Sequence, residues 1–160
     1  MLRIAITLLF LLPATPGIRA QSTPDLNGTW ELNVAQSSYG DRPGPSSRTD
    51  IVDLHNGVFR DAVTAVFRHK TRSYTLTCTT DGKETVFAPG AGIVLPDVTL
   101  NRIAAVWRDG SVELREGLTF EAEDFIEKDT YTLSADKNTL SVAVSVNNSP
   151  PIATYRFDRK

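Results

Sequence analysis

The sequence predicts an all-β protein built as an antiparallel up-and-down meander of short strands. Three observations support this prediction: apolar and polar residues alternate within short segments, tight-turn dipeptides separate these segments, and no segment keeps a helical period. The alternation is clearest near the C-terminus, where Leu140, Val142, Val144 and Val146 share one face. Such a meander must stack as a sandwich or close as a barrel to remove its edges.

The strand candidates follow one another along most of the chain. They cover residues 26–32, 49–55, 58–68, 73–79, 84–87, 98–107, 111–121, 125–134, 139–146 and 152–157. Dipeptides that accept the positive backbone angles of tight hairpins separate several of them: Asn56-Gly57, Asp81-Gly82 and Asp109-Gly110.

Two longer segments lack any strand pattern. Residues 36–47 combine glycines and prolines with serines, a composition typical of loops. In residues 88–96, glycines and a proline oppose regular structure, whereas Ile93, Val94 and Leu95 need burial. This second loop either tucks its apolar residues into the core or folds over an opening.

Residues 1–20 are predicted to be a secretory signal peptide. Arg3 gives a positive start, residues 4–12 form an apolar run, and Ala20 is the small residue after which cleavage is expected. The apolar run is about half the roughly 20 residues that cross a bilayer, so a transmembrane segment is not expected. We therefore expect residues 21–160 to form a single domain that is secreted or periplasmic.

The composition excludes several classes of protein. Of 160 residues, 41% are hydrophobic and 22% are charged, which is typical of one globular domain and not of a disordered chain. The single cysteine excludes a disulfide framework and a thiolate zinc site. With 17 Lys and Arg against 19 Asp and Glu, the chain lacks the basic surface that nucleic-acid binding needs.

A short motif near the mature start favours the barrel. Residues 27–32 contain a Gly-x-Trp sequence that resembles the first strand of lipocalins and related calycin barrels. The resemblance implies a lipocalin-like barrel of about 8–10 strands, in which Trp30 closes one end as a plug. A late arginine would then pack across its ring, with Arg156 as the first candidate and Arg159 as the second. Gly28 would let the backbone pass close to the barrel floor.

Longer segments resemble a group of small exported bacterial proteins of unknown function that carry a lipocalin-like domain. The similar segments are residues 28–33, 80–84, 107–110 and 133–140. The resemblance implies an architecture more strongly than an activity. The chain departs from typical lipocalins because it has no paired cysteines and no helical pattern near its C-terminus.

Catalytic and metal-binding signals are weak, and neither kind of site nor a cofactor is predicted. His55 and His69 lie in separate segments without the spacing of a zinc motif. Cys78 is interpreted as a small buried apolar residue. An acidic run is interpreted as a solvated hairpin end; it consists of Glu121, Glu123, Asp124, Glu127 and Asp129.

The predicted function is the non-catalytic binding of a small hydrophobic or amphipathic ligand inside the barrel. Loops 39–47 and 88–95 would lie near its mouth. A filled barrel that acts as a structural or protein-interaction module is the alternative, because barrels of this size either hold one ligand or fill themselves. An isomerase-like or hydrolase-like barrel would need titratable residues that converge in one cavity, and the sequence shows no such group. The predicted ligand-binding residues are Phe59, Leu76, Phe87, Leu100, Arg102, Phe120, Tyr131 and Tyr155.

Overall fold

A computed structural model describes residues 25–88, 93–94 and 98–160. The described residues form an 11-stranded antiparallel sheet that curls into a nearly closed barrel. One 3₁₀ helix, η1 (Val34–Gln36), follows the first strand. The strands are β1 (Gly28–Leu32), β2 (Ser47–His55), β3 (Val58–Phe67), β4 (Lys70–Thr79), β5 (Thr85–Val86), β6 (Ile93–Val94), β7 (Thr99–Arg108), β8 (Ser111–Phe120), β9 (Glu123–Leu133), β10 (Thr139–Val146) and β11 (Ala153–Arg159).

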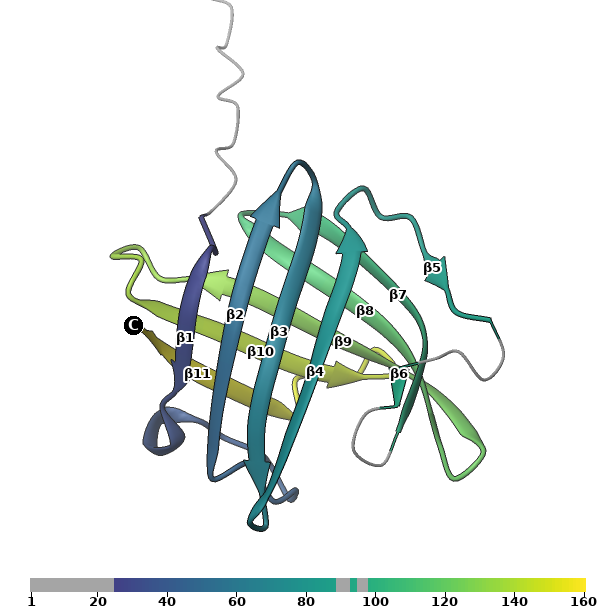
Figure 1. Ribbon diagram of the computed structural model, residues 1–160, viewed down its shortest axis with the longest axis horizontal. Coiled ribbons are helices and arrows are strands. Elements are labelled where there is room, and N and C mark those ends of the chain that lie inside the picture. The colour runs from purple at the N-terminus through teal and green to yellow at the C-terminus, as the bar shows by residue number, and fades with distance from the viewer. Residues whose placement is uncertain (1–24, 89–92, 95–97) are drawn as a thin grey trace, which may run out of the picture.

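The strand order is that of an up-and-down meander whose first and last strands meet. Ten strands pair in the order β4-β3-β2-β1-β11-β10-β9-β8-β7-β5, and β6 also pairs with β7. The front layer of β1 to β4 therefore crosses over the back layer of β7 to β11 (Figure 1). This arrangement confirms the predicted all-β antiparallel meander closed as a lipocalin-like, calycin-type barrel.

Two of the predicted tight hairpins are present. Asn56 and Gly57 have φ angles of 51° and 75°, and Asp109 and Gly110 have 49° and 80°. Both dipeptides join neighbouring antiparallel strands, β2 to β3 and β7 to β8. These turns set the register that places one face of each strand inside the barrel.

The third dipeptide, Asp81-Gly82, does not form a tight hairpin. After β4, Gly82 donates its N–H to the Ala105 carbonyl at 2.9 Å, and Asp81 forms an isolated bridge with Val106. The chain thus passes from β4 across to β7, whereas a tight hairpin would have returned it to β4. The Asp81 carboxylate fixes this path because it accepts hydrogen bonds from the Thr79 hydroxyl and from the Lys83 N–H, at 2.7 and 3.0 Å.

Two local features shift residues relative to the sequence prediction. Strand β2 begins at Ser47, two residues before the predicted start at Thr49, so the strand includes Arg48. In β7 the register shifts between Leu100 and Arg102, and the buried residue that follows Leu100 is Ile103. This bulge moves Arg102 off the inner face. Residues 89–92 and 95–97 of the predicted second loop lie outside the described residues.

The residues of the predicted tryptophan plug, which we call the plug (Trp30 with Arg159 and Gly28), come from β1 and β11. Trp30 is fully buried, and its indole N–H donates to the Leu26 carbonyl at 2.9 Å. The Arg159 guanidinium lies 4.4 Å from the Trp30 ring centroid and donates to the Asn27 and Lys137 carbonyls, both at 2.8 Å.

The arginine over Trp30 is Arg159, the second candidate from the sequence, and not Arg156. Alternation on β11 explains the difference: Phe157 is buried inside, so Arg159 shares its face while Arg156 points outward and is exposed. Gly28 has a φ of +147°, and a Cβ there would lie 3.1 Å from Arg159 Nη1. Glycine at this position therefore admits the guanidinium.

Candidate functional site in the barrel interior

Four carboxyl groups lie buried inside the barrel. Each sits on the inner face of its strand: buried Phe59 and Val63 flank the β3 acid, and buried Leu114 and Leu118 flank the β8 acid. Acidic residues are almost never buried this deeply unless they are paired. We call this group the carboxyl cluster; its members are Asp50, Asp61, Glu116 and Asp129, which are 0%, 0%, 4% and 9% exposed.

The cluster consists of two diagonal pairs on opposite sides of the barrel. On β2 and β3, Asp50 lies opposite Val63 and Asp61 lies two residues away, so the two acids are diagonal neighbours. The same offset relates Glu116 and Asp129 on β8 and β9. In the sheet order, β2, β1, β11 and β10 separate β3 from β9, so the pairs face each other across the interior.

A hydrogen bond crosses the interior between these two sides. The Tyr131 hydroxyl on β9 donates to Asp61 Oδ2 on β3 at 3.1 Å, and both residues are fully buried. The Tyr131 ring also meets the Phe59 ring edge-on, with centroids 5.3 Å apart. These contacts fill the space beside the cluster and hold the Asp61 carboxyl in the middle of the barrel.

Arg48 is a cation of the interior, and it is paired with Asp50. Its Nε and Nη2 atoms donate to the two carboxylate oxygens of Asp50 at 2.7 and 2.8 Å. Its guanidinium also lies 5.2 Å from the Tyr155 ring and 5.4 Å from the Phe157 ring. Burial favours a lower pKa for Arg48, but the charge and hydrogen bonds of Asp50, together with the nearby Tyr74 and Tyr131, raise the pKa. Arg48 therefore remains charged and neutralises Asp50.

The other cluster acids each keep an oxygen without a partner. Among the described residues, no hydrogen-bond donor reaches Asp61 Oδ1, Glu116 Oε1 or Asp129 Oδ1, although all three atoms are buried. The buried Tyr39 hydroxyl is in the same situation. An unsatisfied buried polar group costs about 1–3 kcal/mol, and more when it is charged. The cluster is therefore a costly feature of this fold.

Burial also changes the proton affinity of the cluster. Burial, and then the nearby Asp50 charge, raises the pKa of Asp61 to about 8. Burial and the neighbouring Glu127 raise the pKa of Glu116 to about 8 as well, and the same two causes raise the pKa of Asp129. At neutral pH Asp61 and Glu116 therefore hold protons and can donate hydrogen bonds. A nearby positive charge would favour their ionised form.

The loop between β1 and β2 packs against the interior through Tyr39. Its ring lies 5.4 Å from that of Tyr155, which in turn contacts Arg48. A Cβ on Gly44 would lie 2.2 Å from Tyr39 Cδ2, so glycine is required for the loop to fold over this ring. The loop, part of the predicted mouth segment 39–47, thus connects directly to the Arg48 side of the carboxyl cluster.

Most of the predicted ligand-binding residues lie on the inner side of the barrel. Phe59, Leu76, Leu100 and Tyr131 are buried, and Phe87 and Tyr155 are partly buried against the core.

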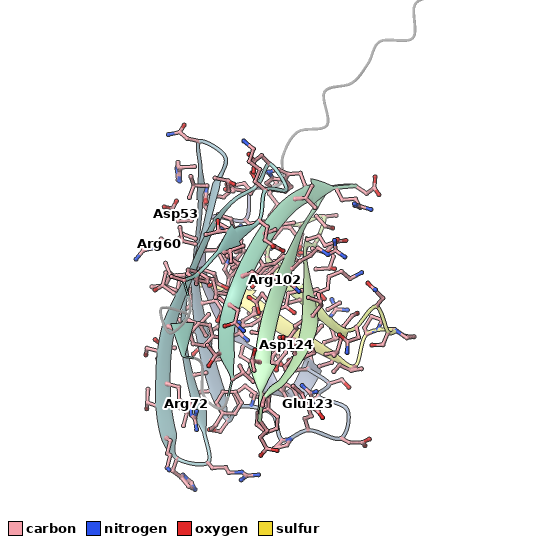
Figure 2. All side chains as sticks on the ribbon, turned by 90° about the vertical axis from the view of Figure 1, so that its right-hand side faces the viewer. Asp53, Arg60, Arg72, Arg102, Glu123 and Asp124 are labelled. Carbon is pink, nitrogen blue, oxygen red and sulfur yellow. The ribbon has the colours of Figure 1, made fainter. Side chains whose placement is uncertain are left out.

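Arg102 and Phe120 do not lie inside the barrel. The Arg102 side chain is 46% exposed on the outer face, where it covers Gly117 and lies 3.8 Å from a Glu84 oxygen (Figure 2). Phe120 is 42% exposed at the end of β8. The bulge in β7 explains the first difference, because a regular strand would keep Arg102 on the face of Leu100.

The carboxyl cluster is absent from the sequence-based prediction, and part of it contradicts that prediction. Glu127 and Asp129 were assigned to a solvated hairpin end, but Asp129 is buried and Glu127 is partly buried. Glu123 and Asp124, which do lie at the β8–β9 hairpin, are exposed (Figure 2). The expectation that no titratable residues converge is wrong for the same reason. An acidic residue at an apolar position of an alternating strand was the available signal.

The described part of the chain lacks two other features. No group of three or more His, Cys, Asp or Glu residues is arranged there to hold a metal ion. No described helix has the length and apolar character needed to span a bilayer.

The sequence matches no protein-family model and no curated protein. Solved structures share the fold. The secretary abundant heat soluble (SAHS) protein of Ramazzottius varieornatus has a TM-score of 0.63 at 9% identity, covering 84% of this chain and 95% of that one. The fatty-acid-binding protein of Manduca sexta has a TM-score of 0.52 at 10% identity, covering 83% and 98%. Human cRBP IV has a TM-score of 0.52 at 11% identity, covering 86% of this chain and 99% of that one. All are calycin-like β-barrels, and at these identities the likeness shows the fold alone.

Proposed function

We propose that the barrel binds a small amphipathic ligand in its interior, with the polar head of the ligand at the carboxyl cluster. The observation that carries this proposal is the set of buried carboxyl oxygens without partners on Asp61, Glu116 and Asp129. Binding sites of this kind are mostly apolar with a few convergent polar groups that orient the ligand. The Manduca sexta neighbour is named as a fatty-acid-binding protein, which supports ligand binding inside such a barrel.

The apolar surroundings of the cluster suit the rest of an amphipathic ligand. Buried aliphatic side chains lie on the strands of the cluster and on the strands next to them: Val63 on β3 and Leu118 on β8, Leu100 opposite Leu118 on β7, and Val144 opposite Asp129 on β10. Burial of a ligand's apolar surface against them is worth about 25 cal/mol per Å². A barrel that only filled itself would be more stable with apolar residues in place of the unpartnered acids.

Native mass spectrometry of the purified protein, followed by solvent extraction, tests this function. We expect a reproducible small-molecule adduct, or uptake of a simple amphiphile such as decanol, decanoate or decyltrimethylammonium. A mass that remains that of the protein alone after exposure to all three amphiphiles would overturn the proposal and favour the filled interaction module. A denatured sample of the same protein controls for nonspecific adducts.

The site would operate outside the cytoplasm. We propose that residues 1–20 direct secretion or export to the periplasm and that the chain belongs with the small exported bacterial proteins it resembles. The support is the order of a positive start, an apolar run and the small residue Ala20. N-terminal sequencing of the protein from an exporting host should begin at Gln21. A product that begins at Met1 would contradict export by cleavage.

The carboxyl cluster also favours a second candidate function, acid–base catalysis on the bound molecule. The pKa values of Asp61 and Glu116, raised to about 8 by burial, lie close to the value that suits proton transfer at neutral pH. Solvent deuterium exchange into a ligand identified by extraction would test it. Exchange that stops in the Glu116→Gln variant would support catalysis, and a ligand that never exchanges would exclude proton transfer to carbon.

A further inference from the structure

We propose that the polar head of the ligand is an organic cation, either a protonated amine or a quaternary ammonium group. This inference rests on the proposed function, because it names the class of molecule that the same interior would bind. It follows from three features: the geometry of the carboxyl cluster, the pairing of Arg48 with Asp50, and the aromatic rings around both.

The balance of charged groups in the described interior favours a cation. The cluster contributes four carboxyl groups, and Arg48 neutralises Asp50 through two short hydrogen bonds. Asp61, Glu116 and Asp129 have no cationic hydrogen-bond partner among the described residues. Arg72 on β4 is partly exposed and is engaged in a contact of its own. The Arg48 charge acts on these three acids but does not keep their pKa values low. A ligand cation would add the positive charge that favours their ionised form.

The same groups oppose an anionic head. A ligand carboxylate between the two carboxyl pairs could bind only while these acids keep their protons, and it would repel each acid that ionises, because buried like charges repel strongly. Arg48 is unsuited to receive it because its Nε and Nη2 atoms already bind Asp50. Its guanidinium also lies against the Tyr155 and Phe157 rings. To form the same two-point pair with Arg48, a ligand carboxylate would have to displace Asp50 and leave that carboxylate buried without a partner.

Aromatic rings beside the cluster add to the preference for a cation. Tyr131 bonds to Asp61 directly, and Tyr74 is close enough that the charges of Asp61 and Glu116 act on it. Ammonium groups bind favourably to the faces of aromatic rings, and more so when water is excluded. Carboxylates flanked by aromatic rings thus match both the charge and the apolar substituents of an alkylammonium head.

Three probes with the same decyl chain separate head-group preference from ligand binding itself. They are decyltrimethylammonium, decanol and decanoate, titrated into the purified protein with tryptophan fluorescence or calorimetry as the readout. We expect the ammonium to bind at least about tenfold more tightly than decanol, and decanoate to bind most weakly. If decanol or decanoate binds as tightly as the ammonium, the cation proposal fails while the proposed function stands. If none of them binds, the proposed function itself fails.

Substitution of a single cluster acid sharpens this test. Glu116→Gln keeps the size of the side chain and removes its ability to ionise, so the preference for the ammonium over decanol should fall about tenfold or more. Glu113→Gln is the matched control, because Glu113 lies on the same strand but on its other face. An unchanged preference in folded Glu116→Gln protein would overturn the proposal. The comparison of the three probes on the unsubstituted protein decides the question if this variant does not fold.

Discussion

The tryptophan plug and the carboxyl cluster are both buried in the same barrel. The polar atoms of the plug have hydrogen-bond partners, whereas several buried oxygens of the cluster have none. In the plug, the indole N–H of Trp30 has an acceptor, and the Arg159 guanidinium donates to carbonyls of three residues. In the cluster, Asp61, Glu116 and Asp129 each keep a buried oxygen without a partner. One region therefore stabilises the fold, whereas the other reduces its stability.

The presence or absence of hydrogen-bond partners thus distinguishes structural residues from candidate binding residues. Natural proteins keep groups that reduce stability mainly where function requires them. A change confined to one of the two regions should therefore leave the other region unchanged.

The largest effect should come from pH acting on the carboxyl cluster. Burial raises the pKa of Asp61 and Glu116 to about 8 in the folded state, against about 4 in an unfolded chain. The folded protein then binds more protons than the unfolded chain between these values. The free energy of unfolding should therefore fall as pH rises from about 5 to about 8, by up to about 1.4 kcal/mol per pH unit for each group.

Urea denaturation across this pH range measures the effect. The double variant Asp61→Asn with Glu116→Gln should flatten the dependence, and Glu113→Gln should leave it unchanged. Stability that rises with pH over this range would contradict the raised proton affinity of the cluster. The titratable and charged groups that face these two acids from the neighbouring strands are Arg48, Asp50, Tyr74, Cys78, Glu127, Asp129 and Tyr131.

Removal of the plug should have the next largest effect. Trp30→Ala empties a fully buried site and should lower the free energy of unfolding by about 3–5 kcal/mol. Trp107→Ala is the matched control, because Trp107 is only partly buried and should cost less. Equal losses in the two variants would show that Trp30 is not a special closure of the barrel. The pH dependence should persist in Trp30→Ala, since the cluster is intact.

The smallest effect distinguishes the two arginines of β11. Arg159→Met removes the contact with the Trp30 ring and three hydrogen bonds to carbonyls, and should cost about 1–2 kcal/mol. Arg156→Met changes an exposed side chain and should stay within about 0.5 kcal/mol of the unsubstituted protein. Thermal unfolding of both variants gives the comparison. A larger loss for Arg156→Met would reverse the assignment of the plug.

Alternation and turn chemistry predict most of the fold but only part of the interior. The strand from Thr139 to Val146 and the turns at Gly57 and Gly110 are visible in the sequence because their patterns are local. Arg102 and Arg156 were misplaced because a bulge or a one-residue offset exchanges the two faces of a strand.

The carboxyl cluster depends on contacts across the barrel, which the sequence does not display. Asp61 and Tyr131 are 70 residues apart, and only closure of the barrel brings them into hydrogen-bond contact. The sequence nevertheless contains one local signal of the cluster, because Glu116 lies between Leu114 and Leu118 on the apolar face of an alternating strand. Acids at such positions indicate interior polar sites in barrels of this kind.

Calorimetry of decyltrimethylammonium binding in two buffers of different ionisation enthalpy tests the central claim most directly. Near neutral pH, a cation at the carboxyl cluster should favour the ionised acids, so binding should release protons into the buffer. We predict an apparent binding enthalpy that changes with the buffer in the direction of proton release, and a smaller change in Glu116→Gln. Tight binding with no proton release, or with proton uptake, would place the ammonium head away from Asp61, Glu116 and Asp129.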